Sequence, residues 1–156
     1  LHDRLAVLGV YVVLEVLRRL DDGSAQPVPQ DESQVTYAPR LKKEDGLIDW
    51  TLDAGRLDAL VRGLKPWPGA YTYLTHAGKP DLRVIVEEAV ECPLPAGVTA
   101  APGTVIESQK RLVVAAGSGA LEIVQLKPES SKTMTGVAFG NGHQVRPGDR
   151  FGRSRD

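Results

Sequence analysis

The sequence predicts a mainly β protein, with a small β-barrel preceded by a helix and a linker and accompanied by flanking helices. Three observations carry this prediction. Helical periodicity is confined to residues 2–20 and 51–65. After Gly69 the apolar residues recur with a period of two, in short runs separated by turn residues. Several short strands at such close spacing are typical of a small barrel.

The first predicted helix spans residues 2–20. Its wide apolar face is formed by Leu5, Leu8, Val12, Val13, Val16, Leu17 and Leu20. Arg18 and Arg19 suit the last turn, and Gly23 is a natural stop. A face this wide needs cover on more than one side, so we expect an isolated helix to self-associate or fray.

A connecting segment follows. Residues 25–34 contain prolines and polar residues and are predicted to be extended rather than helical. A local basic cluster comes next, at Arg40, Lys42 and Lys43, before Glu44 and Asp45 reverse the charge. Two interpretations stay open for this cluster: an ordinary solvated linker, or contact with phosphate groups.

The second predicted helix begins with Thr51 as N-cap and buries one face. That face consists of Leu57, Leu60, Val61 and Leu64. Pro66 ends the helix at Lys65. We expect Pro66 and Pro68 to hold Trp67 in an extended backbone, with its indole filling the seam between helix and sheet.

The remaining chain predicts strands and turns. The predicted strands are residues 70–74, 82–90, 103–107, 112–116 and 121–126, with a last short strand after the turn at 146–151. The first two strands form a hairpin around a turn at 76–80, and 92–102 is a loop. In the fifth strand, Leu121, Ile123 and Gln125 are placed on one side. Residues 127–142 are predicted as loop with a helical turn near 137–139, weakened by Gly136, and 152–156 as a disordered end.

Composition limits the class of protein. The chain has 156 residues, of which 42% are hydrophobic and 25% charged, enough for one modest core. It has no run of about 18 apolar residues, so we expect no membrane span. A single cysteine, Cys92, excludes an internal disulfide and fits the cytosol. Because residue 1 is Leu rather than Met, we expect a longer parent protein.

Charge is unevenly distributed around a net value of −1. Residues 40–80 carry 7 basic and 5 acidic side chains, and residues 103–156 carry 8 and 5.

No catalytic constellation is evident: His2, His76 and His143 lack metal-ligand spacing, and no phosphate-binding glycine loop is present. We therefore predict no catalytic residue and no metal in this chain.

Several motifs resemble the methionyl-tRNA formyltransferase family. They are TYAPRLKKEDGLIDW at 36–50, KPWPGAY at 65–71, LHDRLAVLG at 1–9, APGTVIE at 101–107 and HQVRPGDRF at 143–151. The resemblance implies three parts: the tail of an N-terminal Rossmann-like formyltransferase domain (1–33), an interdomain linker (34–50), and a C-terminal OB-like tRNA-binding domain (51–156). The strand region 71–101 carries little of this signal.

The resemblance also implies a function. A parent enzyme of this family transfers a formyl group from 10-formyltetrahydrofolate to initiator methionyl-tRNA, in the cytoplasm, during translation initiation. The family's catalytic Asn, His and Asp and its folate site belong to the N-terminal domain. We therefore expect this chain to lack a cofactor and to be inactive alone, with the catalytic domain as a partner in cis and no membrane partner.

The expected role of this chain is to bind and position tRNA through basic side chains. The candidates are Arg40, Lys42, Lys43, Arg62, Lys65, Lys132, Arg146 and Arg150. Arg62 can equally pair with Asp58, four residues earlier. Two alternatives remain open at this point: the C-terminal domain of a sugar-nucleotide formyltransferase, and a free-standing protein-interaction barrel.

Overall fold

The computed structural model describes residues 1–75 and 80–153 and separates the chain into two compact units, Leu1–Pro39 and Arg40–Asp156. The first unit holds helix α1 (His2–Asp21) and the 3-10 turn η1 (Glu32–Gln34). Helix α1 has no buried residue, and Gly23, in a left-handed conformation, follows its C-terminus. In the described part of the chain, α1 included, no helix has the length and apolarity that crossing a membrane requires.

One prediction for the first unit is wrong. Residues 25–34 are not extended throughout, because Asp31 nucleates the 3-10 turn η1. The Asp31 carboxylate accepts hydrogen bonds from the backbone N–H of Ser33, at 3.0 Å, and from its hydroxyl, at 2.6 Å. These local hydrogen bonds stabilise the turn, and the two prolines upstream do not interfere with them.

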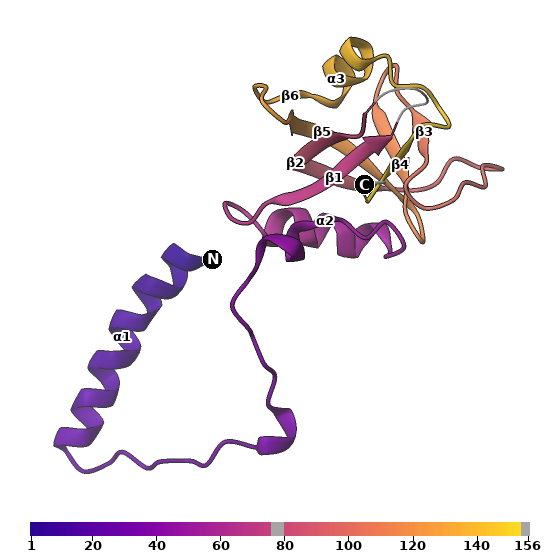
Figure 1. Cartoon of the computed structure of the whole chain (residues 1–156). Coiled ribbons are helices and arrows are strands. Elements are labelled where there is room, and N and C mark those ends of the chain that lie inside the picture. Colours follow the sequence, from indigo (N-terminus) through magenta and orange to yellow (C-terminus); the bar gives the residue numbers. More distant parts are fainter. Residues whose placement is uncertain (76–79, 154–156) are drawn as a thin grey trace. The chain divides into compact units, whose positions relative to one another are not determined.

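The second unit is built around one antiparallel sheet. Its strands are β1 (Ala70–Thr75), β2 (Leu82–Cys92), β3 (Val105–Glu107), β4 (Leu112–Ala115), β5 (Ala120–Pro128), β6 (Met134–Thr135) and β7 (Arg150–Gly152). Their order is β3-β4-β5-β2-β1-β7, with β6 paired to β5. Between the two ends of this order, the N–H of Phe151 donates to the Gly103 carbonyl at 2.7 Å. The sheet is therefore a nearly closed barrel, which confirms the predicted fold class (Figure 1).

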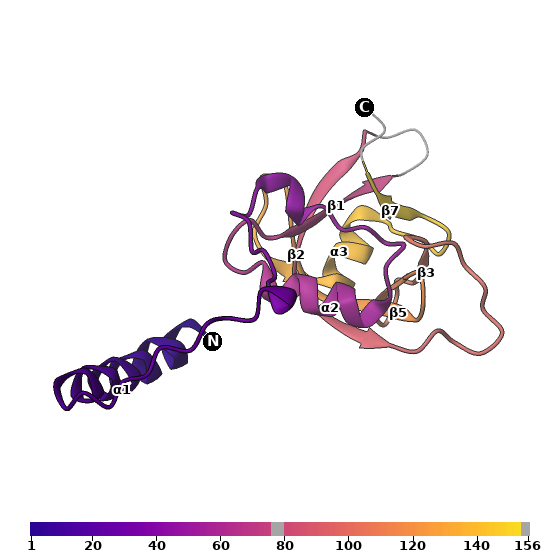
Figure 2. The ribbon, with the colours of Figure 1, turned by 90° about the horizontal axis from the view of Figure 1, so that it is seen from below.

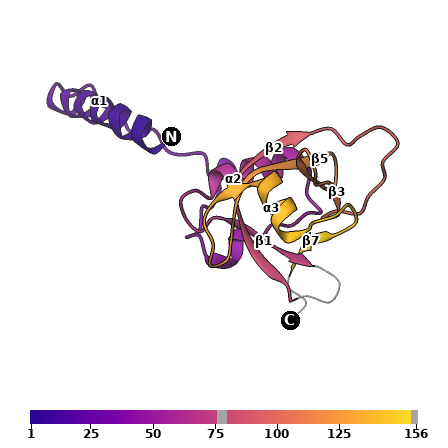
Figure 3. The ribbon, with the colours of Figure 1, turned by 90° about the horizontal axis from the view of Figure 1, so that it is seen from above.

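Two helices lie at opposite ends of this barrel. Helix α2 (Ala54–Gly63) lies across the end nearest the viewer in Figure 2, and helix α3 (Gly136–His143) across the end nearest the viewer in Figure 3. A further 3-10 turn, η2 (Lys43–Gly46), precedes α2. The predicted turn at 76–80 falls mostly outside the described residues, as do positions 154–156 of the predicted disordered end; Gly152 belongs to β7.

Helix α2 buries the predicted face but begins differently. Leu57, Val61 and Leu64 are buried in the core. The N-cap is Asp53 rather than Thr51, and its carboxylate accepts a hydrogen bond from the N–H of Arg56 at 2.9 Å. The Thr51 hydroxyl instead donates to Asp49 at 2.7 Å. A carboxylate cap two residues later is also better placed against the helix dipole.

The predicted side of Gln125 in β5 is wrong. Leu121 and Ile123 face the interior as expected, whereas Gln125 is exposed and Leu126 is buried. The pairing of β5 with β2 shifts register around Glu88. Such a β-bulge breaks the strict period of two, so the next inward residue is Leu126.

The end of the barrel at α3 is more ordered than the sequence suggested. Residues 136–143 form a complete helix, which begins where the Thr135 hydroxyl accepts a hydrogen bond from the N–H of Ala138 at 3.2 Å. A Cβ on Gly136 would collide with the carbonyl oxygen of Ile123 in β5. Glycine therefore allows α3 to lie directly on the sheet, and Phe139 is completely buried beneath it.

The role predicted for Trp67 is wrong, and the buried tryptophan is Trp50, for which the sequence predicted no role. Trp50 is only 4% exposed, and its indole N–H donates to the Thr72 hydroxyl at 3.0 Å. Trp67 is 52% exposed and does not fill the seam between helix and sheet. Residues 64–68 form a turn rather than an extended segment, closed by a 3.0 Å hydrogen bond from the Gly69 N–H to the Leu64 carbonyl. This turn directs Trp67 away from the core.

Candidate nucleic-acid interface

The basic segment before the barrel is fastened to strand β1. The N–H of Ile48 donates to the Tyr71 carbonyl at 2.8 Å, and Leu47 pairs with Tyr71 as an isolated parallel bridge. Just before η2, the backbone N–H of Lys42 donates to the Asp45 carboxylate at 2.7 Å. Lys42 and the adjacent Lys43 are therefore presented from a fixed backbone at the barrel surface, not from a free linker.

An aromatic and basic cluster lies beneath this segment. The guanidinium carbon of Arg83 lies 4.3 Å from the centroid of the Tyr71 ring, a cation–π geometry. The Tyr73 ring meets the Tyr71 ring edge-on, with centroids 6.0 Å apart. All three side chains are half-buried on the outer face of β1 and β2. The Tyr71 ring thereby connects the outer face of the barrel to the docked segment.

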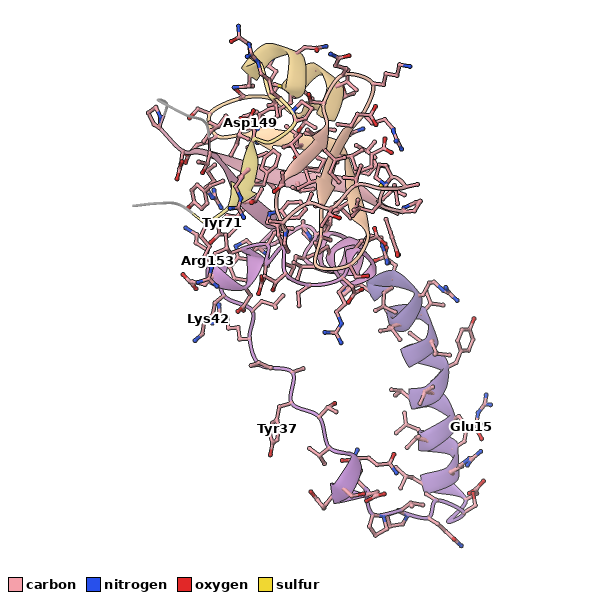
Figure 4. All side chains as sticks on the ribbon, turned by 90° about the vertical axis from the view of Figure 1, so that its right-hand side faces the viewer. Glu15, Tyr37, Lys42, Tyr71, Asp149 and Arg153 are labelled. Carbon is pink, nitrogen blue, oxygen red and sulfur yellow. The ribbon has the colours of Figure 1, made fainter. Side chains whose placement is uncertain are left out.

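The outer face continues onto β5. Tyr71 is paired with Ile85, and Ile85 with Lys127, so the three residues form one row across β1, β2 and β5. In Figure 4, Lys42, Arg153 and Tyr71 lie along one side of the barrel. Hydrogen bonds from the Thr51 hydroxyl and backbone N–H lower the pKa of Asp49, and the positive charge of Arg153 makes a smaller contribution in the same direction.

All eight residues predicted from the sequence to contact tRNA are exposed, but they do not form one cluster. Arg40, Lys42 and Lys43 begin the second unit, and Arg62 and Lys65 belong to α2 and the turn after it. The others lie elsewhere: Lys132 precedes β6, Arg146 follows α3, and Arg150 begins β7. Helix α3 is at the end of the barrel opposite α2, which separates Arg146 from the lysines near α2 (Figure 1).

Among the described residues, ion pairing sets Arg62 apart from the other candidate cations. Arg62 donates to the Asp58 carboxylate at 2.9 Å, as its spacing indicated, and this hydrogen bond raises the pKa of the Arg62 guanidinium. Among residues 1–75 and 80–153, Lys42, Lys43, Lys65 and Lys127 have no carboxylate within 4.0 Å. Unpaired ammonium groups are the ones available to phosphates.

The structure adds basic residues that the sequence analysis did not select. Arg83 lies in a predicted strand but was not among the residues predicted to bind tRNA. Lys127 was assigned to a loop because the fifth strand was predicted to end at residue 126, whereas β5 continues to Pro128. The strict alternation of that strand would have placed Lys127 on the same side as Leu121 and Ile123, so it is the register shift around Glu88 that brings Lys127 to the surface beside Ile85.

Partial burial raises the pKa of the Cys92 thiol, which disfavours the nucleophilic thiolate at neutral pH. In the described part of the chain, no three His, Cys, Asp or Glu side chains are grouped so as to hold a metal ion.

Comparison with known families identifies the second unit. Residues 40–144 match the family model described as formyl transferase, C-terminal domain. The chain belongs to this family. The matched range begins at the same residue as the second compact unit, so the formyl transferase C-terminal domain includes the basic segment docked on β1.

Curated relatives extend the similarity over both units. The chain is 39% identical over 158 residues to a methionyl-tRNA formyltransferase from Bacillus velezensis, covering 100% of the chain and 48% of the relative. It is 42% identical over 149 residues to the enzyme of the same name from Solibacter usitatus, covering 96% of the chain and 45% of the relative. These matches support the resemblance noted in the sequence. The chain spans about half the length of the curated relatives it matches.

Solved structures show a related fold. A variant of HypX from Aquifex aeolicus superposes with a TM-score of 0.53 at 21% identity, over 88% of this chain and 24% of that chain. HypX in complex with tetrahydrofolic acid gives a TM-score of 0.52 at 20% identity, over 87% and 23%. At this identity the likeness concerns the fold alone.

Docking of the basic segment in this formyl transferase C-terminal domain depends on Gly46. A Cβ there would collide with the Gly69 carbonyl oxygen and lie 3.1 Å from the Tyr71 ring. We expect Gly46→Ala to detach η2 locally and leave the barrel folded. The measurement is hydrogen exchange at the amide of Ile48, which should exchange at least about tenfold faster once its bond to Tyr71 is weakened, a free-energy change of about 1.4 kcal/mol. Unchanged protection of Ile48 would contradict this role.

Proposed function

We propose that this chain is the C-terminal part of a methionyl-tRNA formyltransferase, which binds and positions initiator methionyl-tRNA for formyl transfer. The observation that carries the proposal is the docking of Lys42 and Lys43 onto β1 through Tyr71, in a chain whose curated relatives are methionyl-tRNA formyltransferases. Docking holds the basic segment in a fixed position against the barrel. Basic side chains on a fixed backbone can orient a bound RNA, whereas the same side chains on a flexible linker would only attract it.

The binding mechanism is electrostatic and sequence-independent. Each ammonium group that meets a phosphate releases a condensed counterion, so affinity falls as salt rises. Phosphate contacts fix the register and orientation of a nucleic acid without reading its bases. Lys42, Lys43 and Lys65 are the sequence-predicted residues best suited to this role, since they are exposed and unpaired near α2. Arg40 and Arg62 would add to their field, Arg62 less because of Asp58.

Three predicted residues would act at a distance from this surface. Lys132, Arg146 and Arg150 lie toward α3 or on β7, and the Arg150 guanidinium donates to the Pro102 carbonyl at 3.3 Å. A large, curved RNA can contact separate parts of one barrel. We therefore keep these three as secondary contacts, with smaller individual effects on affinity.

The chemical step belongs, in this proposal, to a Rossmann-like formyltransferase domain preceding residue 34. The apolar face of α1, exposed along its whole length, suits packing against such a domain. That domain would hold the donor, 10-formyltetrahydrofolate, and the catalytic groups, in the cytoplasm where translation begins. The division into 1–33, 34–50 and 51–156 stays a prediction. The second compact unit and the range matched by the family model both begin at residue 40, inside the predicted linker.

The test is tRNA binding by the chain over a series of salt concentrations. Initiator tRNA transcript should bind weakly, and the double variant Lys42→Ala, Lys43→Ala should lower the salt slope by about one for each lysine. Lys110→Ala, an exposed lysine in the turn between β3 and β4, is the matched control and should leave the slope unchanged. Absence of tRNA binding at low salt would overturn the proposal and favour a sugar-nucleotide enzyme or a protein-interaction barrel.

A further inference from the structure

Arg83, in β2, is held against an aromatic ring, but its donors have no acceptor in the described part of the chain. Its guanidinium carbon lies over the Tyr71 ring, 4.3 Å from the centroid. Among residues 1–75 and 80–153, no carboxylate lies within 4.0 Å of this guanidinium, and it donates no hydrogen bond. Glu129 is joined to Arg83 only through the backbone, by a 3.0 Å bond from its N–H to the Arg83 carbonyl. Five N–H donors in a rigid fork are therefore left for an external anion.

The Tyr71 ring that carries this guanidinium is itself fixed in the barrel. Tyr71 is paired with Ile85 of β2, and its carbonyl accepts the hydrogen bond from the Ile48 N–H at 2.8 Å. The Tyr73 ring packs against it edge-on, with centroids 6.0 Å apart. An arginine side chain has many rotamers, and a cation–π contact with a fixed ring restricts them before any ligand arrives. Arg83 is therefore preorganised on the outer face of β2.

The same ring connects Arg83 to the basic segment. A Cβ on Gly46, at the end of η2, would lie 3.1 Å from the Tyr71 ring. Lys42 directly precedes η2, and Lys43 is its first residue. The segment that carries these two lysines and the Arg83 guanidinium therefore contact one side chain. An RNA backbone bound by the segment would pass close to Arg83.

We propose that Arg83 binds a backbone phosphate of the tRNA, with Tyr71 as the positioning residue that holds its guanidinium in place. The inference rests on the proposed function and deepens it, because it adds a residue of the barrel sheet to the basic segment. A phosphate is the expected ligand, since it can accept two parallel N–H bonds from one guanidinium. Such a contact orients the RNA without reading its bases.

The first measurement compares Arg83 variants of the 156-residue chain binding initiator tRNA transcript over a series of salt concentrations. Arg83→Gln removes the charge, so binding at low salt should weaken by about tenfold and the salt slope should fall by about one. Arg83→Lys keeps the charge but not the fork, so it should keep the slope and lose part of the affinity. Arg111→Gln is the matched control and should leave the slope unchanged, because Arg111 already donates to Glu107 at 3.1 Å.

The positioning role of Tyr71 is tested separately. Tyr71→Phe keeps the ring and should bind tRNA as the wild type does, whereas Tyr71→Leu should weaken binding by about two- to fivefold. Because loss of the ring can also loosen η2, Tyr71→Leu is measured again in the Arg83→Gln background. Its effect should be smaller there, since the guanidinium that the ring positions is already absent. Equal effects in the two backgrounds would overturn the positioning role.

Hydrogen exchange distinguishes a phosphate contact from a structural role of Arg83. Arg83→Gln should leave exchange at the Ile48 amide unchanged, because that amide bonds to the backbone of Tyr71. Unchanged tRNA affinity in Arg83→Gln overturns the inference, and so does a loss of affinity accompanied by faster exchange at Ile48. If the Lys42, Lys43 double variant still weakens binding in either case, the proposed function survives. If the wild-type chain binds no tRNA at low salt, the proposed function and this inference both fail.

Discussion

Replacing Trp50 with alanine is expected to lower the free energy of unfolding by about 3–5 kcal/mol. The indole lies in the core at 4% exposure, with its ring centroid 6.2 Å from that of Phe151 in β7. Its N–H donates to the Thr72 hydroxyl, which itself donates to the Gly152 carbonyl at 3.1 Å. Trp50 thus connects the segment before α2 to β1 and β7. Removing the indole therefore leaves a cavity in the core and also breaks the hydrogen-bonded link from this segment to β1 and β7.

Two substitutions separate these effects. Trp50→Phe keeps an aromatic ring but removes the donor to Thr72, so we expect a smaller loss of about 1–3 kcal/mol. Trp67→Ala is the matched surface control and should change stability by no more than about 0.5 kcal/mol. The measurement is urea unfolding of each variant, read from the midpoint at constant slope. Equal destabilisation by Trp50→Ala and Trp67→Ala would contradict the assignment of the two tryptophans.

The contrast between the two tryptophans shows which features the sequence can predict. Helices α1 and α2 and most strands follow from the spacing of apolar residues, because that spacing is local. The burial of Trp50 is different, because its partners Thr72 and Phe151 lie far along the chain. Trp67 stands beside a helix with a clear apolar face, and proximity in sequence suggested a packing role. The turn at residues 64–68 instead leaves Trp67 exposed, and the geometry of that turn cannot be predicted from the spacing of apolar residues.

The basic residues of the candidate interface also fall into two groups, those that the sequence predicted and those that it did not. Lys42 and Lys43 were predicted because basic residues adjacent in sequence are visible without a structure. Lys127 and Arg83 were missed because their neighbours are set by strand register. Only the pairing of β1, β2 and β5 places Lys127 in the row with Tyr71. A surface assembled from several strands is therefore harder to predict than one carried by a single segment.

Gly136→Ala is expected to lower the free energy of unfolding by about 1–3 kcal/mol, although alanine is the better helix former. Gly136 is the first residue of α3, in a region where the sequence predicted only a helical turn. An added Cβ would collide with the Ile123 carbonyl oxygen and lie 2.9 Å from the Leu112 Cβ. Both neighbours belong to the sheet, so neither can move without disturbing the core. The close approach of α3 to β5 outweighs helix propensity here.

Gly63→Ala is the matched control, because Gly63 is also a helical glycine but has open space around it. Nothing lies within 4 Å of a Cβ built there, at the end of α2. We expect this change to raise stability by about 0.4–1 kcal/mol, since alanine reduces the entropy of the unfolded chain. Urea unfolding of the two variants should therefore shift the midpoint in opposite directions. If Gly136→Ala also raised the midpoint, close packing of α3 on the Ile123 carbonyl would not be the reason for glycine at that position.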